Sequence, residues 1–234
     1  MMSTDPSILP DAQVIPELSY DEVAELAYFG ARILHARMIA PLKEHGIPTR
    51  VKNVFKPDGP GTLIHETAAT LRHSIKAVTS INALALSTDR SGSLSMVTQL
   101  VNDALFETVG SRAEVTISSQ SSSRSLLCFV IPTSAGPDAV RAAQQSVEAR
   151  MIDHPDTHTW EMQQVTVITT IGSSLDEQPE VISNILAAVQ GVRILAVTQG
   201  PAYCSFSIVV EPAQAREALE HIHALAVSKH TSRR

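Results

Sequence analysis

A short polar turn is the first part of the sequence that could bind a charged small molecule. Leu94 begins a helical pattern directly after four residues typical of turns and caps, Asp89, Ser91, Gly92 and Ser93. The free N–H groups and dipole at a helix N-terminus favour a carboxylate, and the Asp89 carboxylate can pair with an ammonium group. The turn therefore fits an amino-acid ligand. An ordinary capped helix is the alternative, since Ser91 and Ser93 are good N-caps.

Two glutamines at the ends of strand-like runs are further candidates for ligand contacts. Gln120 and Ser121 lie in the polar run Ser-Ser-Gln-Ser-Ser-Ser, and Gln199 begins Gln-Gly-Pro-Ala-Tyr. Polar groups at strand ends can bind the carboxylate and the amine of a small molecule, although a plain hairpin loop explains the same residues. We expect the first run to be the stronger site, because the second lacks hydroxyl groups beside its glutamine.

The cysteines and histidines do not indicate a metal site. Cys128 and Cys204 each lie inside an apolar run without a nearby second cysteine, which is typical of buried thiols in a reducing compartment. His221 and His223 are two residues apart on an expected helix and do not share a face. The sequence therefore predicts neither a metal nor a disulfide.

Composition excludes several classes of protein. The 234 residues carry a net charge of −6, which disfavours nucleic acid as a partner. Hydrophobic residues make up 44% and aromatic residues 4%, so we expect an aliphatic core. The chain lacks an apolar run long enough for a membrane helix and a recognisable secretory signal. These features predict a cytoplasmic protein of one to three domains without membrane contact.

An internal repeat organises residues 81–227. Each copy reads strand, helix, strand, strand, helix, and the two hairpins align with Ser119-Gln120-Ser121 opposite Thr198-Gln199-Gly200. A further strand at 157–164 would complete the first copy, and a strand-like run at 75–78 precedes it. This order predicts an α+β fold made of two ferredoxin-like sandwiches, with helices on one face of an antiparallel sheet. The expected strands lie at 81–87, 113–119, 125–131, 165–171, 192–198 and 205–210.

The first 66 residues have the pattern expected for the last part of a larger domain. Ser19 and Glu22 have the spacing of a capping box, and an apolar helical pattern follows. Pro41 is expected to kink or restart the helix, and Gly46 to end it. A strand is expected at 50–54 and a turn at 57–61. This segment has too few apolar residues for a sizeable core of its own.

These patterns together resemble a known family. A βαββαβ repeat with a glycine turn after its first strand resembles the ACT domain, an amino-acid-sensing module. Thr4-Asp5-Pro6, LPDAQVIPELSYDEVAELAYFGARILHARMIAPL and GIPTRVKNVFKPDGPGTLI resemble the C-terminal end of the aspartokinase catalytic domain. That domain is followed in the family by tandem ACT domains. The resemblance covers the chain to about residue 227.

The resemblance also implies nucleotide-site residues, with departures. Arg32 and Ile33 match the family's Phe-Gly-Ala-Lys-Val-Leu-His-Pro stretch, where Arg32 replaces a lysine and Ala36 a proline. Ser7 replaces the arginine that follows the Asp-Pro pair. The family's phosphate-binding Lys-Phe-Gly-Gly-Thr segment does not occur in the sequence. We therefore expect no catalytic residue and no cofactor in this chain, with ATP and magnesium needed only by a complete kinase.

The resemblance divides the chain and assigns it a role. It implies the end of a catalytic domain at 1–66, a connector and edge strand at 67–80, ACT domains at 81–164 and 165–228, and a tail at 229–234. The implied role is feedback control of an aspartate kinase through binding of lysine or threonine, with a homodimer formed by the ACT domains. Two alternatives remain: a chain that completes an active site with a separate N-terminal catalytic chain, or a stand-alone amino-acid sensor.

Overall fold

The computed structural model describes residues 1–30, 36–66, 75–88, 93–110, 112, 114–131, 137–154 and 160–231. The chain folds into two compact units. The main unit comprises Met1–Ile81 and Val167–Arg234, and the insert unit comprises Asn82–Thr166. The insert unit therefore interrupts the main unit in the sequence, and each is described by itself.

The N-terminal part of the main unit contains a small sheet and two helices. Its strands β1 (Glu17–Leu18), β3 (Thr62–Ile64) and β2 (Thr49–Val51) pair in that order. Helix α1 (Tyr20–Tyr28) begins with the predicted capping box, in which the Ser19 side chain accepts from the Glu22 N–H and Glu22 accepts from the Ser19 N–H. Helix α2 (Ala36–Glu44) contains Pro41 and is followed by Gly46 at positive φ.

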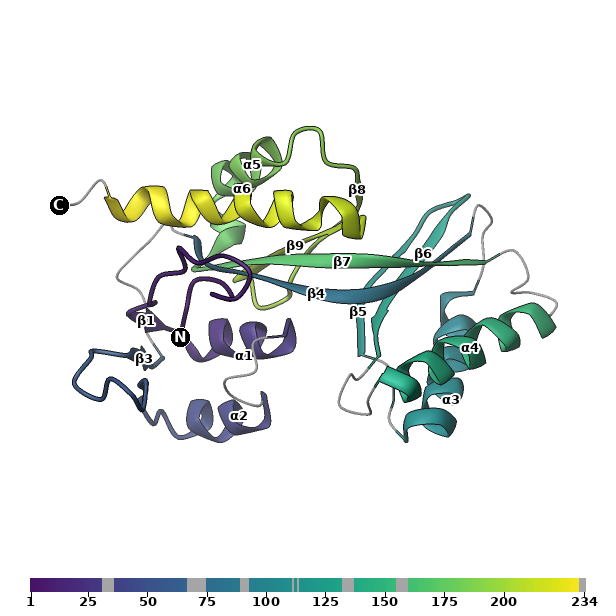
Figure 1. Ribbon diagram of the computed structural model, residues 1–234, viewed down its shortest axis with the longest axis horizontal. Coiled ribbons are helices and arrows are strands. Elements are labelled where there is room, and N and C mark those ends of the chain that lie inside the picture. Colours follow the sequence, from purple (N-terminus) through teal and green to yellow (C-terminus); the bar gives the residue numbers. More distant parts are fainter. Residues whose placement is uncertain are drawn as a thin grey trace. The chain divides into compact units, whose positions relative to one another are not determined.

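The C-terminal part of the main unit is the second ferredoxin-like repeat (Figure 1). Its strand order is β4-β7-β9-β8, built from residues 75–81 of β4 (Ile75–Thr88), residues 167–172 of β7 (Glu161–Gly172), β9 (Ser205–Val210) and β8 (Ile194–Gln199). A 3-10 turn η2 (Leu175–Glu177) leads into α5 (Pro179–Ala188), and α6 (Pro212–Thr231) ends the unit. Ile185 and Leu219 of these helices pack against Ile168 and Ile208 of the sheet.

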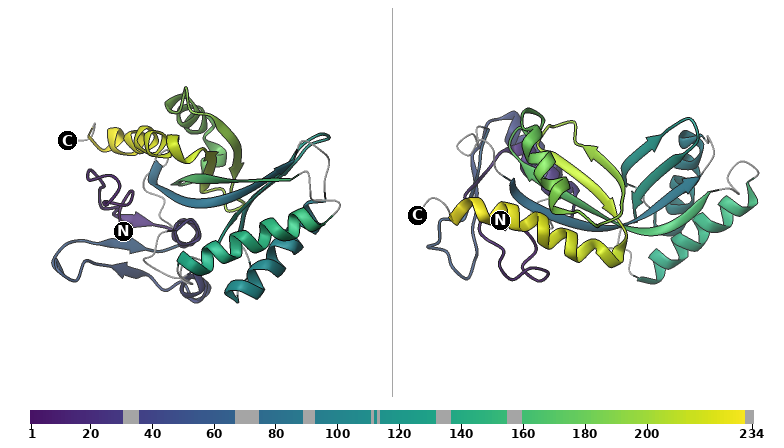
Figure 2. Two further views of the ribbon diagram at one scale, coloured as in Figure 1. Left: turned by 45° about the vertical axis from the view of Figure 1, so that its right-hand side comes forward. Right: turned by 90° about the horizontal axis from the view of Figure 1, so that it is seen from above.

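Helix α1, part of the kinase-like segment (residues 1–66), covers the other face of the main unit's sheet. Val23 and Leu26 of α1 share a buried cluster with Ala77 of β4 and Ile171 of β7. Figure 2 shows α1 on the opposite side of these strands from α5 and α6. Gly30 follows α1 with φ of +101°, and a Cβ there would lie 2.4 Å from Ile81 Cγ2. Only glycine permits this close approach of the helix end to β4.

The insert unit is the first repeat. Residues 82–88 of β4, helix α3 (Leu94–Val109), strands β5 (Glu114–Gln120) and β6 (Ser125–Val130), helix α4 (Pro137–Asp153) and the start of β7 follow one another. The strand order is β5-β6-β4-β7, as in a ferredoxin-like sheet. Val97 and Val147 of the helices pack against Leu127 and Phe129 of β6. The predicted α+β class with two ferredoxin-like repeats is thus confirmed.

Several predicted boundaries differ from the structure. The strand runs expected at 75–78 and 81–87 form one strand, β4, because Ile75–Thr88 contains neither proline nor glycine to interrupt it. The strands expected at 157–164 and 165–171 likewise join in β7, which begins at Glu161. Helix α6 continues to Thr231, so its last turn lies in the stretch expected to be a tail.

Candidate functional site

Three polar residues form a row at one end of the insert unit's sheet. Thr88 pairs with Ser125, and Ser125 pairs with Gln120, across β4, β6 and β5. Leu86 and Leu127, two residues before Thr88 and two after Ser125, face the core beneath the helices. Side chains alternate along a strand, so Thr88, Ser125 and Gln120 lie on this same face, in a row of about 10 Å.

Ser125 is the unusual member of this row. Its side chain is 2% exposed, and its Oγ has no hydrogen-bond partner among the residues the structure describes. A buried hydroxyl without a partner costs about 1–3 kcal/mol, so such a group calls for a specific explanation. Thr88 is also buried, whereas Gln120 is exposed. The row therefore runs from the interior of the unit to its surface.

The predicted turn residues lie next to this row in the chain. Ser93 is the N-cap of α3, and its side chain accepts a hydrogen bond from the Met96 N–H. Leu94 begins the helix and packs against the core. Asp89, Ser91 and Gly92 lie outside the described residues.

Ser121 has a structural task. Its Oγ accepts from the Arg124 N–H at 3.0 Å, and its N–H donates to the Arg124 carbonyl at 2.8 Å, which closes the tight turn between β5 and β6. The hairpin interpretation thus accounts for this side chain. Gln120, which ends β5 beside the turn, remains the more direct candidate for a ligand contact.

The same end of the second repeat is closed by the protein's own groups. The Gly172 N–H donates to the Cys204 carbonyl and the Leu175 N–H to the Tyr203 carbonyl, which ties the turn after β7 to the β8–β9 turn. Gln199 ends β8 and is exposed. Gln120 pairs with Ser125, whereas Gln199 pairs with Phe206, so an apolar ring occupies the position that corresponds to Ser125. The two repeats are therefore chemically different at this end.

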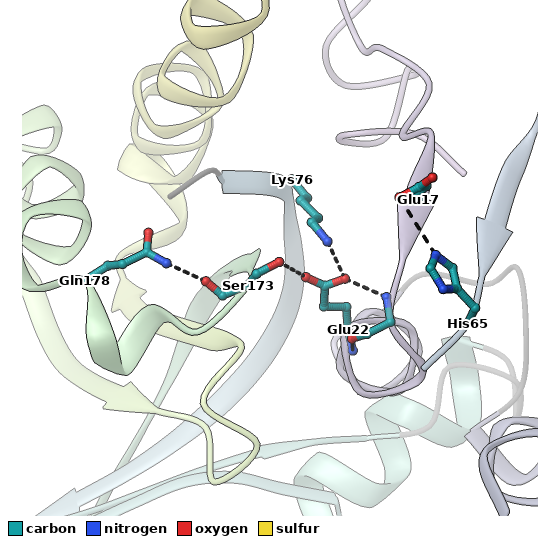
Figure 3. Close-up of polar contacts among 7 residues, drawn as sticks. Glu17, Glu22, His65, Lys76, Ser173 and Gln178 are labelled. Atoms are coloured by element: carbon teal, nitrogen blue, oxygen red, sulfur yellow. Dashed lines mark hydrogen bonds and ion pairs between the residues drawn. The ribbon is translucent and has the colours of Figure 1, made fainter. Parts of the chain in front are cut away.

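A buried polar cluster joins α1 to the second repeat (Figure 3). Glu22 Oε2 accepts from Lys76 Nζ at 2.8 Å, and Glu22 Oε1 accepts from Ser173 Oγ at 2.9 Å. The side chains of Lys76 and Glu22 are only 4% and 2% exposed. Gln178 Nε2 donates to the carbonyl of Ser173 and so holds the turn after β7. One carboxylate of the kinase-like helix thus contacts β4 and the turn after β7.

A second carboxylate of α1 makes a related contact. Glu25 Oε2 accepts from Ser205 Oγ at 2.6 Å, at the start of β9. Cys204 lies beside this contact, and burial, reinforced by Glu25, raises the pKa of its thiol to about 12. Burial also raises the pKa of Cys128 to about 12. Both thiols are therefore buried and uncharged at neutral pH, as the sequence predicts.

The residues expected near a nucleotide give a mixed result. Ser7 donates from its N–H and its Oγ to Asp5 Oδ1, at 2.8 and 2.7 Å, and these bonds lower the pKa of Asp5. Arg32 and Ile33 lie outside the described residues. Where the structure describes the chain, it contains no group of three His, Cys, Asp or Glu side chains placed to hold a metal ion.

Sequence reasoning missed the residues that the structure makes most prominent. Ser125 reads as an ordinary strand residue, and no local sequence pattern marks it as different. Glu22 was identified through its cap, whereas its contact with Lys76 spans 54 positions and its contact with Ser173 spans 151. No local sequence signal identifies pairs at such separations.

Comparison with known proteins supports the kinase-like assignment of the N-terminal segment. The sequence model of the amino acid kinase family matches residues 1–53. A bifunctional aspartokinase/homoserine dehydrogenase of Haemophilus influenzae is 26% identical over 221 residues, which cover 94% of this chain and 27% of that protein. Aspartokinase 1 of Arabidopsis thaliana is 27% identical over 237 residues, covering 95% of this chain and 39% of that protein.

Solved structures share the fold over nearly the whole chain. The aspartate kinase of Clostridium acetobutylicum superposes with a TM-score of 0.75 at 21% identity, covering 96% of this chain and 51% of that one. Aspartokinase III of E. coli in complex with aspartate and ADP gives a TM-score of 0.71 at 18% identity, covering 95% and 49%.

The fold and the matches place this protein in a class in which two ferredoxin-like repeats accompany a segment similar to amino acid kinases. The chain is similar to aspartokinases over nearly its whole length. It spans about a quarter of the length of the bifunctional relatives and about half of the solved aspartate kinases. No helix in the described part of the chain has the length and apolar character needed to cross a membrane.

Proposed function

We propose that this chain is the regulatory C-terminal portion of an aspartate kinase and binds an amino-acid effector, lysine or threonine, through its first repeat. The observation that supports this role best is the polar row Thr88, Ser125 and Gln120 beside the start of α3. The Ser125 hydroxyl, which has no partner within the described ranges, offers a hydrogen bond that a ligand can complete. The α3 N-terminus favours the carboxylate of that ligand.

The relatives add support for this class of ligand. An E. coli aspartokinase III structure of the same fold is described as a complex with lysine and aspartate, and it superposes with a TM-score of 0.70 over 97% of this chain. In the proposed role, the bound amino acid controls phosphorylation of aspartate as feedback from the aspartate-family pathway. The active site, ATP and magnesium belong to the complete kinase.

The test is a thermal-shift screen of the chain against the twenty amino acids, followed by calorimetric titration of Ser125→Ala. We expect lysine or threonine to stabilise the parent chain and to bind Ser125→Ala roughly 5- to 150-fold more weakly, the equivalent of about 1–3 kcal/mol. The stability of the unliganded variant should be unchanged or higher, because the buried hydroxyl loses no partner in the part of the chain that the structure describes. A stabilising amino acid whose affinity is unaffected by Ser125→Ala would contradict this site.

A second role is favoured by a different observation. Residues 1–53 match the amino acid kinase family, and Val54 and Phe55, which follow directly, are 80% and 91% exposed. Apolar side chains this exposed fit an interface with the preceding part of a kinase domain, whether on the same or a separate chain. Reconstitution of aspartate kinase activity with a separate N-terminal chain, and its loss in Phe55→Ser, would support this role.

A stand-alone amino-acid sensor is the remaining alternative. It shares the ligand site of the first role and lacks the kinase partner of the second. Amino-acid binding without association with any kinase segment would therefore favour it. The kinase-like match of residues 1–53 makes it the weaker proposal.

A further inference from the structure

The insert unit is joined to the main unit at two points in the chain. The first lies between Ile81 and Asn82 in β4, and the second between Thr166 and Val167 in β7. These two strands are therefore the covalent routes by which a change in the insert unit reaches the main unit. The kinase-like segment belongs entirely to the main unit.

Both routes lead to the same carboxylate. Lys76, on the main-unit part of β4, donates to Glu22 Oε2, and Ser173, directly after β7, donates to Glu22 Oε1. Figure 3 shows the two donors approaching Glu22 from β4 and from the turn after β7. The same Oε2 accepts from the Ser19 N–H at 2.7 Å, so the carboxylate also caps α1. A shift of either strand thus acts on the first turn of the kinase-like helix.

Burial makes this arrangement sensitive to small movements. Lys76 and Glu22 are almost fully removed from solvent, and both carboxylate oxygens of Glu22 have partners. Water cannot replace a lost partner at such a site, so breaking one contact costs far more than at the surface. The cluster therefore favours one arrangement of β4, β7 and α1 over displaced ones.

Glu25 provides a natural comparison on the same helix. Its carboxylate accepts a hydrogen bond from Ser205 on β9, a strand that lies entirely within the main unit. This hydrogen bond of Glu25 therefore fastens α1 to the second repeat through β9, which is neither of the two strands that lead from the insert unit.

We propose that Glu22 is the residue through which the state of the insert unit is transmitted to helix α1. This inference rests on the proposed function only for the identity of the natural signal, an amino acid bound to the insert unit. The role of Glu22 in transmission does not depend on that signal. It applies to any change that makes the insert unit more or less stable. Glu22 acts here as a positioning residue and contacts no ligand.

The experiment measures hydrogen exchange of the full chain by mass spectrometry, with two perturbations of the insert unit. The first is addition of L-lysine or L-threonine. The second is Val97→Ala, which removes part of a fully buried side chain from the core of the insert unit. The readouts are exchange in the insert unit itself and exchange in the peptides that contain residues 19–29.

Three variant proteins distinguish contacts that transmit a change in the insert unit from contacts that only hold α1 against the second repeat. Ser173→Ala removes the contact from the turn after β7. The pair Glu22→Gln with Lys76→Met removes the β4 ion pair without leaving a buried unpaired charge. Glu25→Gln is the matched control on the same helix. Each background is first compared with the parent chain for folding by circular dichroism.

In the parent chain and in Glu25→Gln, we expect each effective perturbation to change exchange of residues 19–29 by about 5-fold or more, the lower end of typical coupling between sites. In Ser173→Ala and in the pair Glu22→Gln with Lys76→Met, we expect the change in exchange of residues 19–29 to fall below about 2-fold. The change in exchange of the insert unit itself should be retained in both. An undiminished response in those backgrounds would overturn the inference. If neither amino acid protects the insert unit, the proposed function fails, and Val97→Ala still decides this inference.

Discussion

At the scale of single residues, the two repeats differ in what they offer a ligand. Gln120 lies opposite Ser125, whose buried hydroxyl has no partner among the described residues, whereas Gln199 lies opposite Phe206 and next to a turn whose N–H groups are already bonded. A zwitterion needs hydrogen-bond donors for its carboxylate and acceptors for its ammonium group. The first repeat therefore offers a hydrogen-bonding group to a ligand at this end, whereas the corresponding groups of the second repeat already bond to the protein itself.

The first prediction compares the two glutamines. Gln120→Ala should weaken binding of the best effector by about 5- to 150-fold, because its ligand partner is left without a hydrogen bond. Gln199→Ala should change the affinity far less. Calorimetric titration of both variants measures the difference. Equal losses would place the ligand in contact with both glutamines, and a loss only in Gln199→Ala would identify the second repeat as the site.

The second prediction concerns pH. His223 of α6 is 1% exposed, with its Nε2 2.8 Å from Ser3 Oγ, and burial lowers its pKa despite Asp11 nearby. Its contribution to stability is complete above the unfolded pKa of about 6.5 and is lost as the pH falls toward the lower folded value. Urea unfolding between pH 7.5 and 5.5 should show this loss.

The matched comparison for that prediction uses the same helix. In His223→Gln the decline in unfolding free energy between pH 7.5 and 5.5 should be smaller than in the parent chain. His221, which is exposed, provides the control, and His221→Gln should decline as the parent does. Identical pH profiles for all three proteins would refute the assignment to His223.

At the scale of elements, the β8–β9 turn must pass close to α1. Gly200 begins this turn, and a Cβ there would lie 2.0 Å from Ser205 Oγ and 3.1 Å from Glu25 Oε2. The space that a side chain would need is therefore filled by the hydrogen bond that joins β9 to α1. A glycine is required here by contact rather than by backbone conformation.

The third prediction tests this contact. Gly200→Ala should lower the free energy of unfolding by about 1–3 kcal/mol, because Ser205 must turn away and release Glu25. In a Ser205→Ala background the obstructing oxygen is gone, so the same substitution should cost clearly less. Chemical denaturation of the four proteins gives the coupling between the two positions. Strictly additive effects would show that Ser205 is not what excludes a side chain.

How much of the fold and of the site can be predicted from the sequence depends on how far apart in the chain the interacting residues lie. The capping box of Ser19 and Glu22 is readable because three residues separate its members, and the ferredoxin-like repeats are readable from strand and helix periodicity. The joining of two predicted strands into β4 depends on pairing with neighbouring strands. The partners of Glu22 depend on tertiary packing, so sequence patterns predict the elements of the site but not its contacts.

At the scale of the whole molecule, the strand order ends in two edge strands, each of which pairs on one side only among the described strands. β5 and β8 lie at the two ends of the strand order, and Val197 on β8 is 52% exposed. Exposed edges of this kind pair readily with other strands.

The fourth prediction is self-association through an exposed edge. We expect sedimentation at tens of micromolar to give a species heavier than the 25.2 kDa monomer. Val197→Lys should shift the chain toward the monomer, because a charge opposes pairing at β8. Ile152→Lys places the same charge on an exposed position of α4 and should leave association unchanged. A parent chain that sediments only as monomer would end this proposal.

The fifth prediction concerns catalysis. A protein made of residues 1–234 should form no aspartyl phosphate from ATP and aspartate. Phosphoryl transfer needs cations and N–H groups arranged around the γ-phosphate, and this sequence contains no phosphate-binding loop. A hydroxamate assay against a complete aspartate kinase measures this. Turnover by the pure chain would show that the kinase-like segment is catalytic after all.

The long separation between α1 and its partners has a consequence for biosynthesis. Glu25 contacts Ser205, which is 180 positions later in the chain, and Ser3 contacts His223, 220 positions later. At typical rates of translation the partners of α1 emerge roughly 10 to 40 seconds after the helix itself. The insert unit, whose residues are contiguous, can fold within that interval. We therefore expect the kinase-like segment to be made first and to reach its final packing last.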